Sequence, residues 1–141
     1  MFLVDTNVIS EARKGERANP GVLAFLRTTP AEKLYLAVQT IGEIRRGQRQ
    51  IALRGDAEQA ARLNTWMDLI INEYRDRILD FDLDCAQVWG SLLSPHPQHS
   101  IDKQIAAIAL IHGMTVVTRN AADFQGTGVI TINPFTPSAA T

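Results

Sequence analysis

Short apolar runs alternate along this chain with longer stretches in which apolar residues recur every three or four positions. The runs have the composition of buried strands and lie at 2–4, 33–38, 77–81, 114–118 and 129–132, the third being the weakest. The spacing between them predicts helices at about 8–14, 20–28, 39–54, 56–74, 85–93 and 101–112. Strands that alternate with helices predict an α/β fold, a three-layer α/β/α sandwich around a central, mostly parallel sheet.

Length and charge place limits on this picture. The chain has 141 residues, enough for one domain with a sizeable core, which we expect at 1–133. Residues 134–141 contain two prolines and then small residues, so a flexible C-terminal tail is expected there. A formal net charge of −1 gives no global attraction to nucleic acid, although a local basic face could still bind phosphates.

The remaining composition predicts a soluble, cytoplasmic protein. Cys85 is the only cysteine, which excludes an intrachain disulfide and argues against a cysteine-ligated metal. No apolar run approaches the length of a membrane span, and the N-terminus lacks the pattern of a signal peptide.

Four acidic residues occupy similar places in the pattern. Asp5 directly follows the first strand, Glu43 stands near the start of the helix after the second, and Asp123 lies just beyond the 114–118 strand. Asp102 stands in the first turn of the most apolar helix. Because the carboxyl ends of parallel strands lie at one edge of a sheet, we expect these carboxylates to converge there.

Helix capping is the simpler explanation for each carboxylate taken alone. Glu43 lies three residues after Thr40, which is the spacing of a capping box, and Asp102 lies two residues after a possible cap at Ser100. Capping does not require all of these side chains to meet, however, and it does not explain why so apolar a helix begins with a carboxylate. Capping remains the preferred interpretation only for Glu43.

Carboxylates brought together repel one another, so protonation or a metal must neutralise some of them. An all-oxygen site suits Mg²⁺ or Mn²⁺, and a pair of such ions can activate water and stabilise an in-line displacement at phosphorus. The histidines lack a zinc-binding spacing: His96 and His99 are expected in a surface loop and His112 at a helix C-terminus.

Four stretches of the chain resemble, in order, the motifs of the PIN domain, and more narrowly those of VapC and FitB-like toxins of prokaryotic type II toxin-antitoxin systems. They are VDTNVIS at 4–10, TIGEI at 40–44, IDKQIAA at 101–107 and TRNAADF at 118–124. Each motif alone is weak, but the ordered set is specific and covers essentially the whole chain.

The resemblance implies a Mg²⁺- or Mn²⁺-dependent endoribonuclease that hydrolyses RNA phosphodiester bonds at an acidic, two-metal-type site. By matching position, the catalytic residues would be Asp5, Glu43, Asp102 and Asp123, with Asp5 and Asp102 as the metal ligands. Hydrogen bonds that steady these groups or the attacking water would come from Thr6, Asn7, Thr118 and Asn120.

The same resemblance implies particular partners. Such toxins halt translation until a cognate antitoxin of the VapB or FitA type blocks them, and they commonly form homodimers. The antitoxin carries the DNA-binding portion, so contact with DNA would be only indirect.

Basic residues follow the acidic motifs closely, at Arg13, Lys14, Arg17, Arg45, Arg46, Arg49, Lys103 and Arg119. We predict contacts with substrate phosphates for Lys103, Arg119 and Arg46, whereas Arg17 and Arg49 are interpreted as parts of solvated helix faces. The 95–99 loop is richer in proline and histidine than the resemblance predicts, and this departure concerns substrate access rather than the metal site.

Two other functions remain open from the sequence. A phosphoryl-transfer enzyme with an aspartyl nucleophile would need a second Asp two positions after Asp5, where Asn7 stands. A PIN-like module that binds RNA or protein without cutting is the other, but the presence of all four carboxylates gives no sign of a degenerate site.

Overall fold

A computed structural model of the chain describes residues 1–137 and contains a five-stranded parallel sheet. The strands are β1 (Phe2–Val4), β2 (Leu34–Ala37), β3 (Ile78–Leu79), β4 (Thr115–Val117) and β5 (Thr131–Ile132), in the order β3-β2-β1-β4-β5. The predicted parallel sheet is confirmed. The two edge strands are shorter than predicted, since each pairs with a neighbour on one side only.

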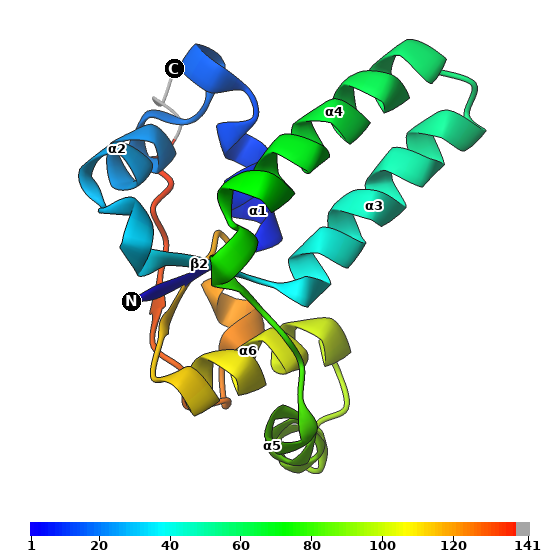
Figure 1. Cartoon of the computed structure of the whole chain (residues 1–141). Coiled ribbons are helices and arrows are strands. Elements are labelled where there is room, and N and C mark those ends of the chain that lie inside the picture. The colour runs from blue at the N-terminus through cyan, green and yellow to red at the C-terminus, as the bar shows by residue number, and fades with distance from the viewer. Residues whose placement is uncertain (138–141) are drawn as a thin grey trace.

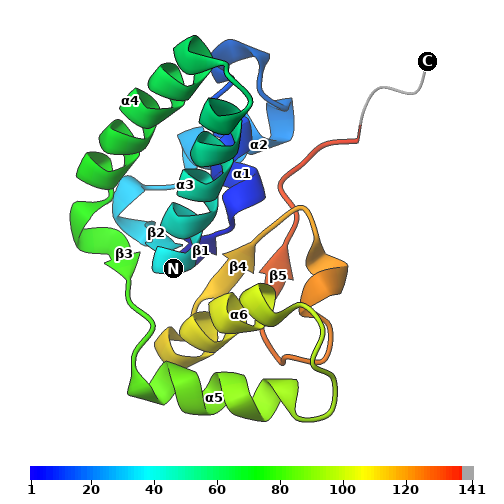
Figure 2. The same ribbon diagram turned by 90° about the vertical axis from the view of Figure 1, so that its right-hand side faces the viewer.

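Helices cover both faces of this sheet (Figures 1 and 2). One face carries α1 (Thr6–Ala12), α2 (Pro20–Thr28), α3 (Val38–Leu53) and α4 (Ala57–Glu73), and the other carries α5 (Leu83–Leu93) and α6 (Ser100–His112). Short 3₁₀ turns occur at η1 (Gly15–Arg17), η2 (Ala31–Lys33), η3 (Arg75–Arg77) and η4 (Ala121–Phe124). The three-layer α/β/α architecture is therefore confirmed, with α3 and α4 as an antiparallel hairpin (Figure 1).

The sheet divides the interior into two cores because successive strand residues point to opposite faces. On β1, Leu3 packs with Cys85 and Ile105 against the side of α5 and α6, whereas the next residue, Val4, packs with Val8 on the side of α1 to α4. The α6 helix is buried over most of its length, as its apolar sequence predicts. This burial holds the first turn of α6 in a fixed place beside the sheet.

Two helix caps that the sequence predicts beside the acidic residues are not observed. The α3 helix begins at Val38 directly after β2, so Thr40 lies inside the helix, is fully buried and caps nothing. The capping-box explanation for Glu43 is therefore wrong. Ser100 is the first residue of α6 rather than its cap, and the capping position belongs to His99, which makes no side-chain capping hydrogen bond.

The C-terminal segment packs against α2 instead of forming a flexible tail from residue 134. Asn19 caps α2, and its side chain also accepts a 3.0 Å hydrogen bond from the Thr136 backbone N–H and donates one of 2.9 Å to the Thr136 carbonyl. Phe135 packs against the core beside α1 to α4. The prediction is wrong for Pro134–Thr136, and residues 138–141 lie outside the described part of the chain.

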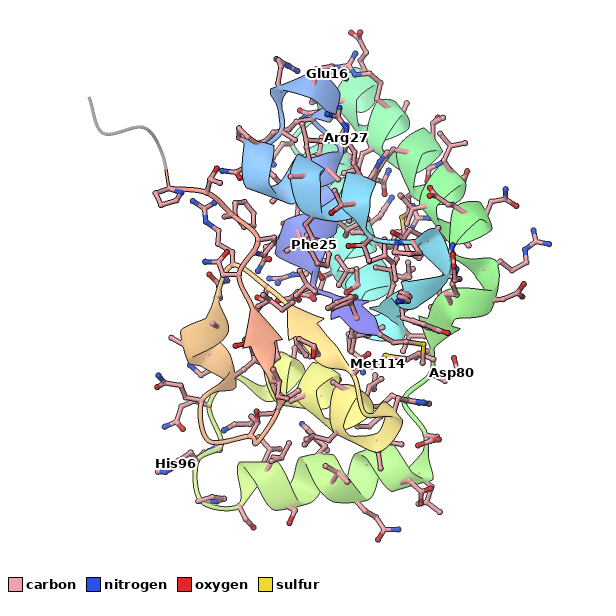
Figure 3. The ribbon with its side chains drawn as sticks, turned by 90° about the vertical axis from the view of Figure 1, so that its left-hand side faces the viewer. Glu16, Phe25, Arg27, Asp80, His96 and Met114 are labelled. Carbon is pink, nitrogen blue, oxygen red and sulfur yellow. The ribbon has the colours of Figure 1, made fainter. Side chains whose placement is uncertain are left out.

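Smaller contacts fix the remaining surface elements. Glu16 of η1 and Arg27 of α2 form an exposed ion pair of 3.2 Å between side chains on neighbouring elements (Figure 3).

None of the helices described in residues 1–137 combines the length and the apolar character that crossing a lipid bilayer would require.

Candidate metal centre

Asp5 stands at the carboxyl end of β1, the central strand of the sheet. The chain connections on the two sides of this strand run in opposite directions. It is 5 % exposed, and Oδ1 caps α1 by accepting a 2.8 Å hydrogen bond from the Thr6 N–H. Oδ2 accepts from the Thr118 hydroxyl at 2.8 Å and from the Asn7 amide at 3.3 Å. Asp5 is therefore both a helix cap and a fixed, buried carboxylate at a topological switch point of the sheet, where ligands bind in folds of this type.

Glu43 reaches the same edge from the first turns of α3. The Thr6 hydroxyl donates a 2.8 Å hydrogen bond to Glu43 Oε1, and the Thr40 hydroxyl lies 3.0 Å from Thr6 Oγ1. Because the proton of Thr6 is directed at the carboxylate, Thr40 acts as the donor toward Thr6. The carboxylate of Glu43 is thereby joined to the segment that carries Asp5.

Residues just after β4 complete the support of Asp5. Thr118 is fully buried, and its Oγ1 accepts a 3.1 Å hydrogen bond from the Asn120 backbone N–H. Asn7 accepts a 3.0 Å bond from the Arg119 N–H while its amide donates to Asp5. The predicted contacts of Thr6, Asn7 and Thr118 with carboxylates are thus present, whereas Asn120 contributes through its backbone.

Asp102 and Asp123 face each other across a histidine. His99 Nδ1 lies 3.8 Å from Asp102 Oδ2 and 3.8 Å from Asp123 Oδ1. His99 lies in a surface loop, as predicted, but its proximity to the carboxylates is not expected from the sequence. Its position three residues before Asp102, at the start of a helix, was the available signal.

The electrostatics of the site show that the carboxylates interact. The pKa of Asp102 is raised to about 6 by burial and then by the charges of Asp5, Asp123 and Glu43. Burial also raises the pKa of Asp5, although the hydrogen bonds to its oxygens oppose the shift. Partial desolvation raises the pKa of Glu43, against the bond from Thr6. All four predicted carboxylates therefore share one region of negative potential.

Among the residues that the structure describes, no lysine or arginine side chain forms a direct ion pair with this cluster. Within residues 1–137, no Lys or Arg nitrogen lies within 4.0 Å of Asp5, Glu43, Asp102 or Asp123. The potential ligand atoms of His99, Asp102 and Asp123 all lie within 4.8 Å of one another. A set of mainly carboxylate oxygens without a protein counter-ion fits a hard divalent cation.

The predicted substrate-binding residues occupy different environments. Arg46 is exposed, and its charge partly opposes the rise in the pKa of Glu43 that burial causes. Arg119 is exposed, and its guanidinium lies 4.8 Å from the centre of the Phe135 ring. Lys103 differs, since it is buried and donates from Nζ to the carbonyl oxygen of His96, in the loop before α6 (Figure 3). This contact assigns Lys103 to holding the loop, rather than to the phosphate contact that the sequence predicts.

A basic recess of about 350 Å³ lies at the far end of α1. It is lined by Ser10, Arg13, Lys14, Arg17, Gln59 and Arg62. Lys14 and Arg62 form ion pairs with Glu11 and Glu58, but among residues 1–137 no carboxylate lies within 4.0 Å of Arg13 or Arg17.

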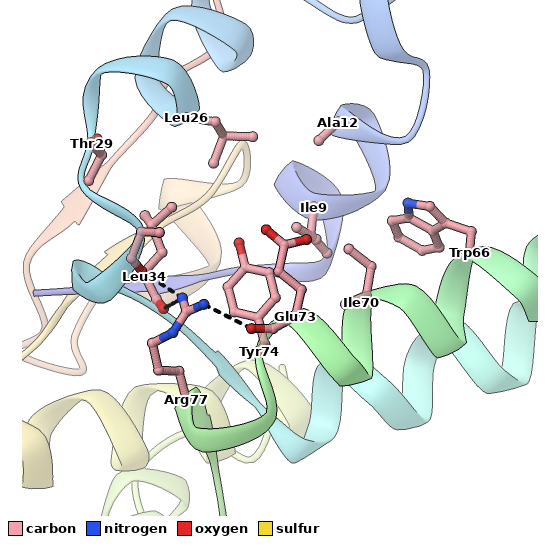
Figure 4. Close-up of a pocket in the computed structure, with 11 residues that line it drawn as sticks. Ile9, Ala12, Leu26, Thr29, Leu34, Trp66, Ile70, Glu73, Tyr74 and Arg77 are labelled. Carbon is pink, nitrogen blue, oxygen red and sulfur yellow. Dashed lines mark hydrogen bonds between the residues drawn. The ribbon is translucent and has the colours of Figure 1, made fainter.

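A second recess, of about 320 Å³, opens between α1, α2 and α4 (Figure 4). Its wall combines apolar side chains, such as Ile9, Leu26 and Ile70, with about as much polar surface, and the Tyr74 hydroxyl and the Glu73 carboxylate point into it. At its base, Arg77 donates hydrogen bonds of 2.7 Å and 3.0 Å to the carbonyls of Leu34 and Glu73.

Comparison with known proteins decides the family. The model of the PIN domain matches residues 2–128. The chain belongs to the PIN domain family. This PIN domain is 37% identical to the plasmid stability protein StbB of Pseudomonas syringae pv. tomato, over 96% of the chain and 99% of that protein. It is 32% identical to a VapC ribonuclease of Sinorhizobium fredii, over 98% of the chain and 100% of that protein.

Solved structures support the same assignment. A structure described as FitAB bound to an IR36 DNA fragment matches this PIN domain with a TM-score of 0.83 and 33% identity, covering 100% of both chains. A structure of FitAcB from Neisseria gonorrhoeae matches with a TM-score of 0.81 and 31% identity, over 95% of this chain and 98% of that one. The fold expected from the resemblance is confirmed over the whole length.

Proposed function

We propose that this PIN domain is the toxin of a type II toxin-antitoxin system and acts as a Mg²⁺- or Mn²⁺-dependent endoribonuclease. The observation that carries the proposal is the convergence of Asp5, Glu43, Asp102 and Asp123 at one sheet edge with no Lys or Arg nitrogen within 4.0 Å. Relatives described as a VapC ribonuclease and as the toxin FitB support the same activity and role.

The carboxylates have separate tasks in this proposal. Asp5 and Asp102 would hold the ion, and Asp123 and Glu43 would complete its surroundings. The bound ion would supply positive charge for the scissile phosphate and lower the pKa of the attacking water.

Hydrogen bonds within the chain prepare the site for this chemistry. The Asp5 carboxylate accepts hydrogen bonds from Thr118, Asn7 and the Thr6 N–H. These three bonds keep it from rotating away from the sheet edge. The Thr6 hydroxyl fixes Oε1 of Glu43. The other oxygen, Oε2, would accept the proton that the attacking water releases, which the raised pKa of Glu43 favours.

The RNA backbone would extend from the carboxylates along α1 to the basic recess. From Asp5 to Arg13 the helix advances by about 12 Å, at about 1.5 Å per residue. Arg13 and Arg17, which have no carboxylate partner among residues 1–137, would neutralise phosphates beyond the scissile one. Arg119 and Arg46 lie nearer the site and would contact the phosphates flanking it.

A cognate antitoxin would block this enzyme, and the recess between α1, α2 and α4 is the surface we assign to it. An apolar side chain of the antitoxin would enter beside Ile9 and Ile70. Solved structures described as FitAB and as toxin-antitoxin complexes resemble this fold, which supports such a partner. A homodimer and indirect contact with DNA through the antitoxin stay predictions, which light scattering and DNA-binding assays of the complex would test.

Expression in a bacterial host tests the toxin role. The chain expressed alone should arrest growth, and both Asp5→Asn and co-expression with the protein encoded next to it should relieve the arrest. Harmless expression of soluble protein would contradict the proposal. If co-expression with the neighbouring protein relieves the growth arrest but the Asp5→Asn variant still arrests growth, the toxin role would stand and the metal site at Asp5 would be contradicted.

A further inference from the structure

His99 occupies a backbone conformation that histidine rarely adopts. Its φ of 56° makes it the one residue other than glycine with a positive φ in residues 1–137. The left-handed region is unfavourable for a residue that carries a Cβ atom. His99 is also the capping residue of α6, yet its side chain makes no capping hydrogen bond, so the helix does not explain the imidazole.

The imidazole instead faces two carboxylates at equal distances. His99 Nδ1 lies 3.8 Å from both Asp102 Oδ2 and Asp123 Oδ1, which is too long for a hydrogen bond. Two ligands bound to one ion at about 2.1 Å lie about 3.0 Å apart when adjacent and about 4.2 Å apart when opposite. Both observed separations lie between these two values, so the three atoms would move closer by roughly 0.8 Å to bind one ion as adjacent ligands.

Access to these atoms is open. The side chains of His99, Asp102 and Asp123 are 50%, 28% and 33% exposed, so an ion can enter without unfolding the loop. Lys103 anchors the same loop by donating to the carbonyl of His96, which fixes the backbone three residues before His99. The loop backbone beside His99 is therefore held by a contact within the chain.

We propose that His99 Nδ1 is a nitrogen ligand of the ion of the proposed function, which Asp102 holds and Asp123 helps to surround, and that it favours Mn²⁺ over Mg²⁺. This inference rests on the metal site of the proposed function. Mg²⁺ is a hard ion that keeps oxygen ligands and water, so an imidazole adds little to its affinity. Transition-metal ions accept imidazole nitrogen more readily, and the same ligand therefore adds more to the binding of Mn²⁺.

A competing role for His99 makes the opposite prediction. A protonated imidazole 3.8 Å from two carboxylates would act as a counter-ion and would have to leave when a metal binds. Removing such a counter-ion would strengthen metal binding, whereas removing a ligand weakens it.

The test compares wild-type protein with His99→Asn and, as a matched control in the same loop, His96→Asn. Asn tolerates a positive φ better than most residues, so the backbone at 99 is retained. Mn²⁺ affinity is measured from the EPR signal of the free ion, and Mg²⁺ affinity by competition. His99→Asn should weaken Mn²⁺ binding about tenfold or more and Mg²⁺ binding much less, while His96→Asn changes neither.

Pulsed EPR of the bound Mn²⁺ gives a second readout, which does not depend on the measured affinity. Wild type and His96→Asn should show the coupling of a coordinated imidazole nitrogen, and His99→Asn should lose it. Absence of this coupling in wild type, or tighter Mn²⁺ binding by His99→Asn, would overturn the inference. Asp5→Asn separates the two proposals. If Asp5→Asn loses RNA cleavage while His99→Asn binds metal as wild type does, the metal site of the proposed function stands and only the role of His99 is contradicted.

Discussion

The hydroxyl of Thr118 donates a 2.8 Å hydrogen bond to Oδ2 of Asp5, joining residues that are 113 positions apart in the chain. They stand at the carboxyl ends of β4 and β1, which are neighbours in the parallel sheet. Thr118 is fully buried and Asp5 is 5 % exposed, so water does not replace this bond readily. The ends of these two neighbouring strands are thus tied together at the point where we place the metal.

Replacing Thr118 with Val removes this donor and preserves the shape of the side chain. The buried carboxylate would lose a hydrogen bond to a charged group, which is typically worth about 1.5–3 kcal/mol, and the Asn120 N–H would lose its acceptor, so this range is a lower bound. Urea unfolding should show a loss of at least this size, and Mn²⁺ affinity should fall with it. Thr115→Val, in the same strand but without a side-chain hydrogen bond among the described residues, is the matched control. Equal stability of the two variants would contradict the assigned contact.

The pKa of Asp102 predicts how stability depends on pH without metal. Its folded pKa is about 6 against an ordinary 3.8, so between these values the folded state holds a proton that the unfolded state has released. The contribution of this group to stability is therefore complete below the lower value and is lost as pH rises through about 6. The melting temperature of the metal-free protein should fall over this window.

Two comparisons isolate the effect of Asp102. Asp102→Asn should flatten the fall in melting temperature, and Mn²⁺ should stabilise wild type more at about pH 7.5 than at about pH 5, because protons compete with the ion for the same carboxylate. A pH profile unchanged by Asp102→Asn would show that other groups cause it.

Lys103→Met separates the two roles considered for this residue. The substitution keeps the apolar stem but removes the donor to the carbonyl of His96, so hydrogen exchange in the 95–99 loop should rise several-fold. If Lys103 instead binds phosphate, RNA affinity will fall while exchange in the loop stays as in wild type.

Gly21 and Gly47 are both helical glycines with opposite surroundings. A Cβ at Gly21 would lie 2.1 Å from the Pro134 carbonyl oxygen, whereas one at Gly47 would meet nothing within 4 Å. Gly21→Ala should therefore cost about 1–3 kcal/mol or displace the C-terminal segment, and Gly47→Ala should stabilise α3 by about 0.5–1 kcal/mol. Denaturant unfolding measures both. A stabilising Gly21→Ala would mean that the segment does not pack against α2.

The sequence predicts the elements well because their causes are local. The apolar run before Asp5 forms the central strand, and the spacing in 56–74 forms α4. The four carboxylates follow from the same logic, since parallel strands bring their carboxyl ends to one edge.

The contacts that escaped prediction are those set by tertiary packing. Thr40 has the capping-box spacing from Glu43, but it lies inside α3 because the helix begins directly after β2. The docking of Phe135 depends on Asn19 and Gly21, more than a hundred residues earlier. His99 is remote from Asp123 in sequence, and only the turn before α6 brings them together.

Cleavage of RNA by purified Asp5→Asn tests the central claim most directly. Asp68→Asn, an exposed carboxylate on α4, is the matched control. With Mn²⁺ present, wild type and Asp68→Asn should cut a single-stranded RNA, while Asp5→Asn should lose cleavage by about two orders of magnitude or more and bind Mn²⁺ weakly. Undiminished cleavage by Asp5→Asn would contradict the metal centre built on this residue.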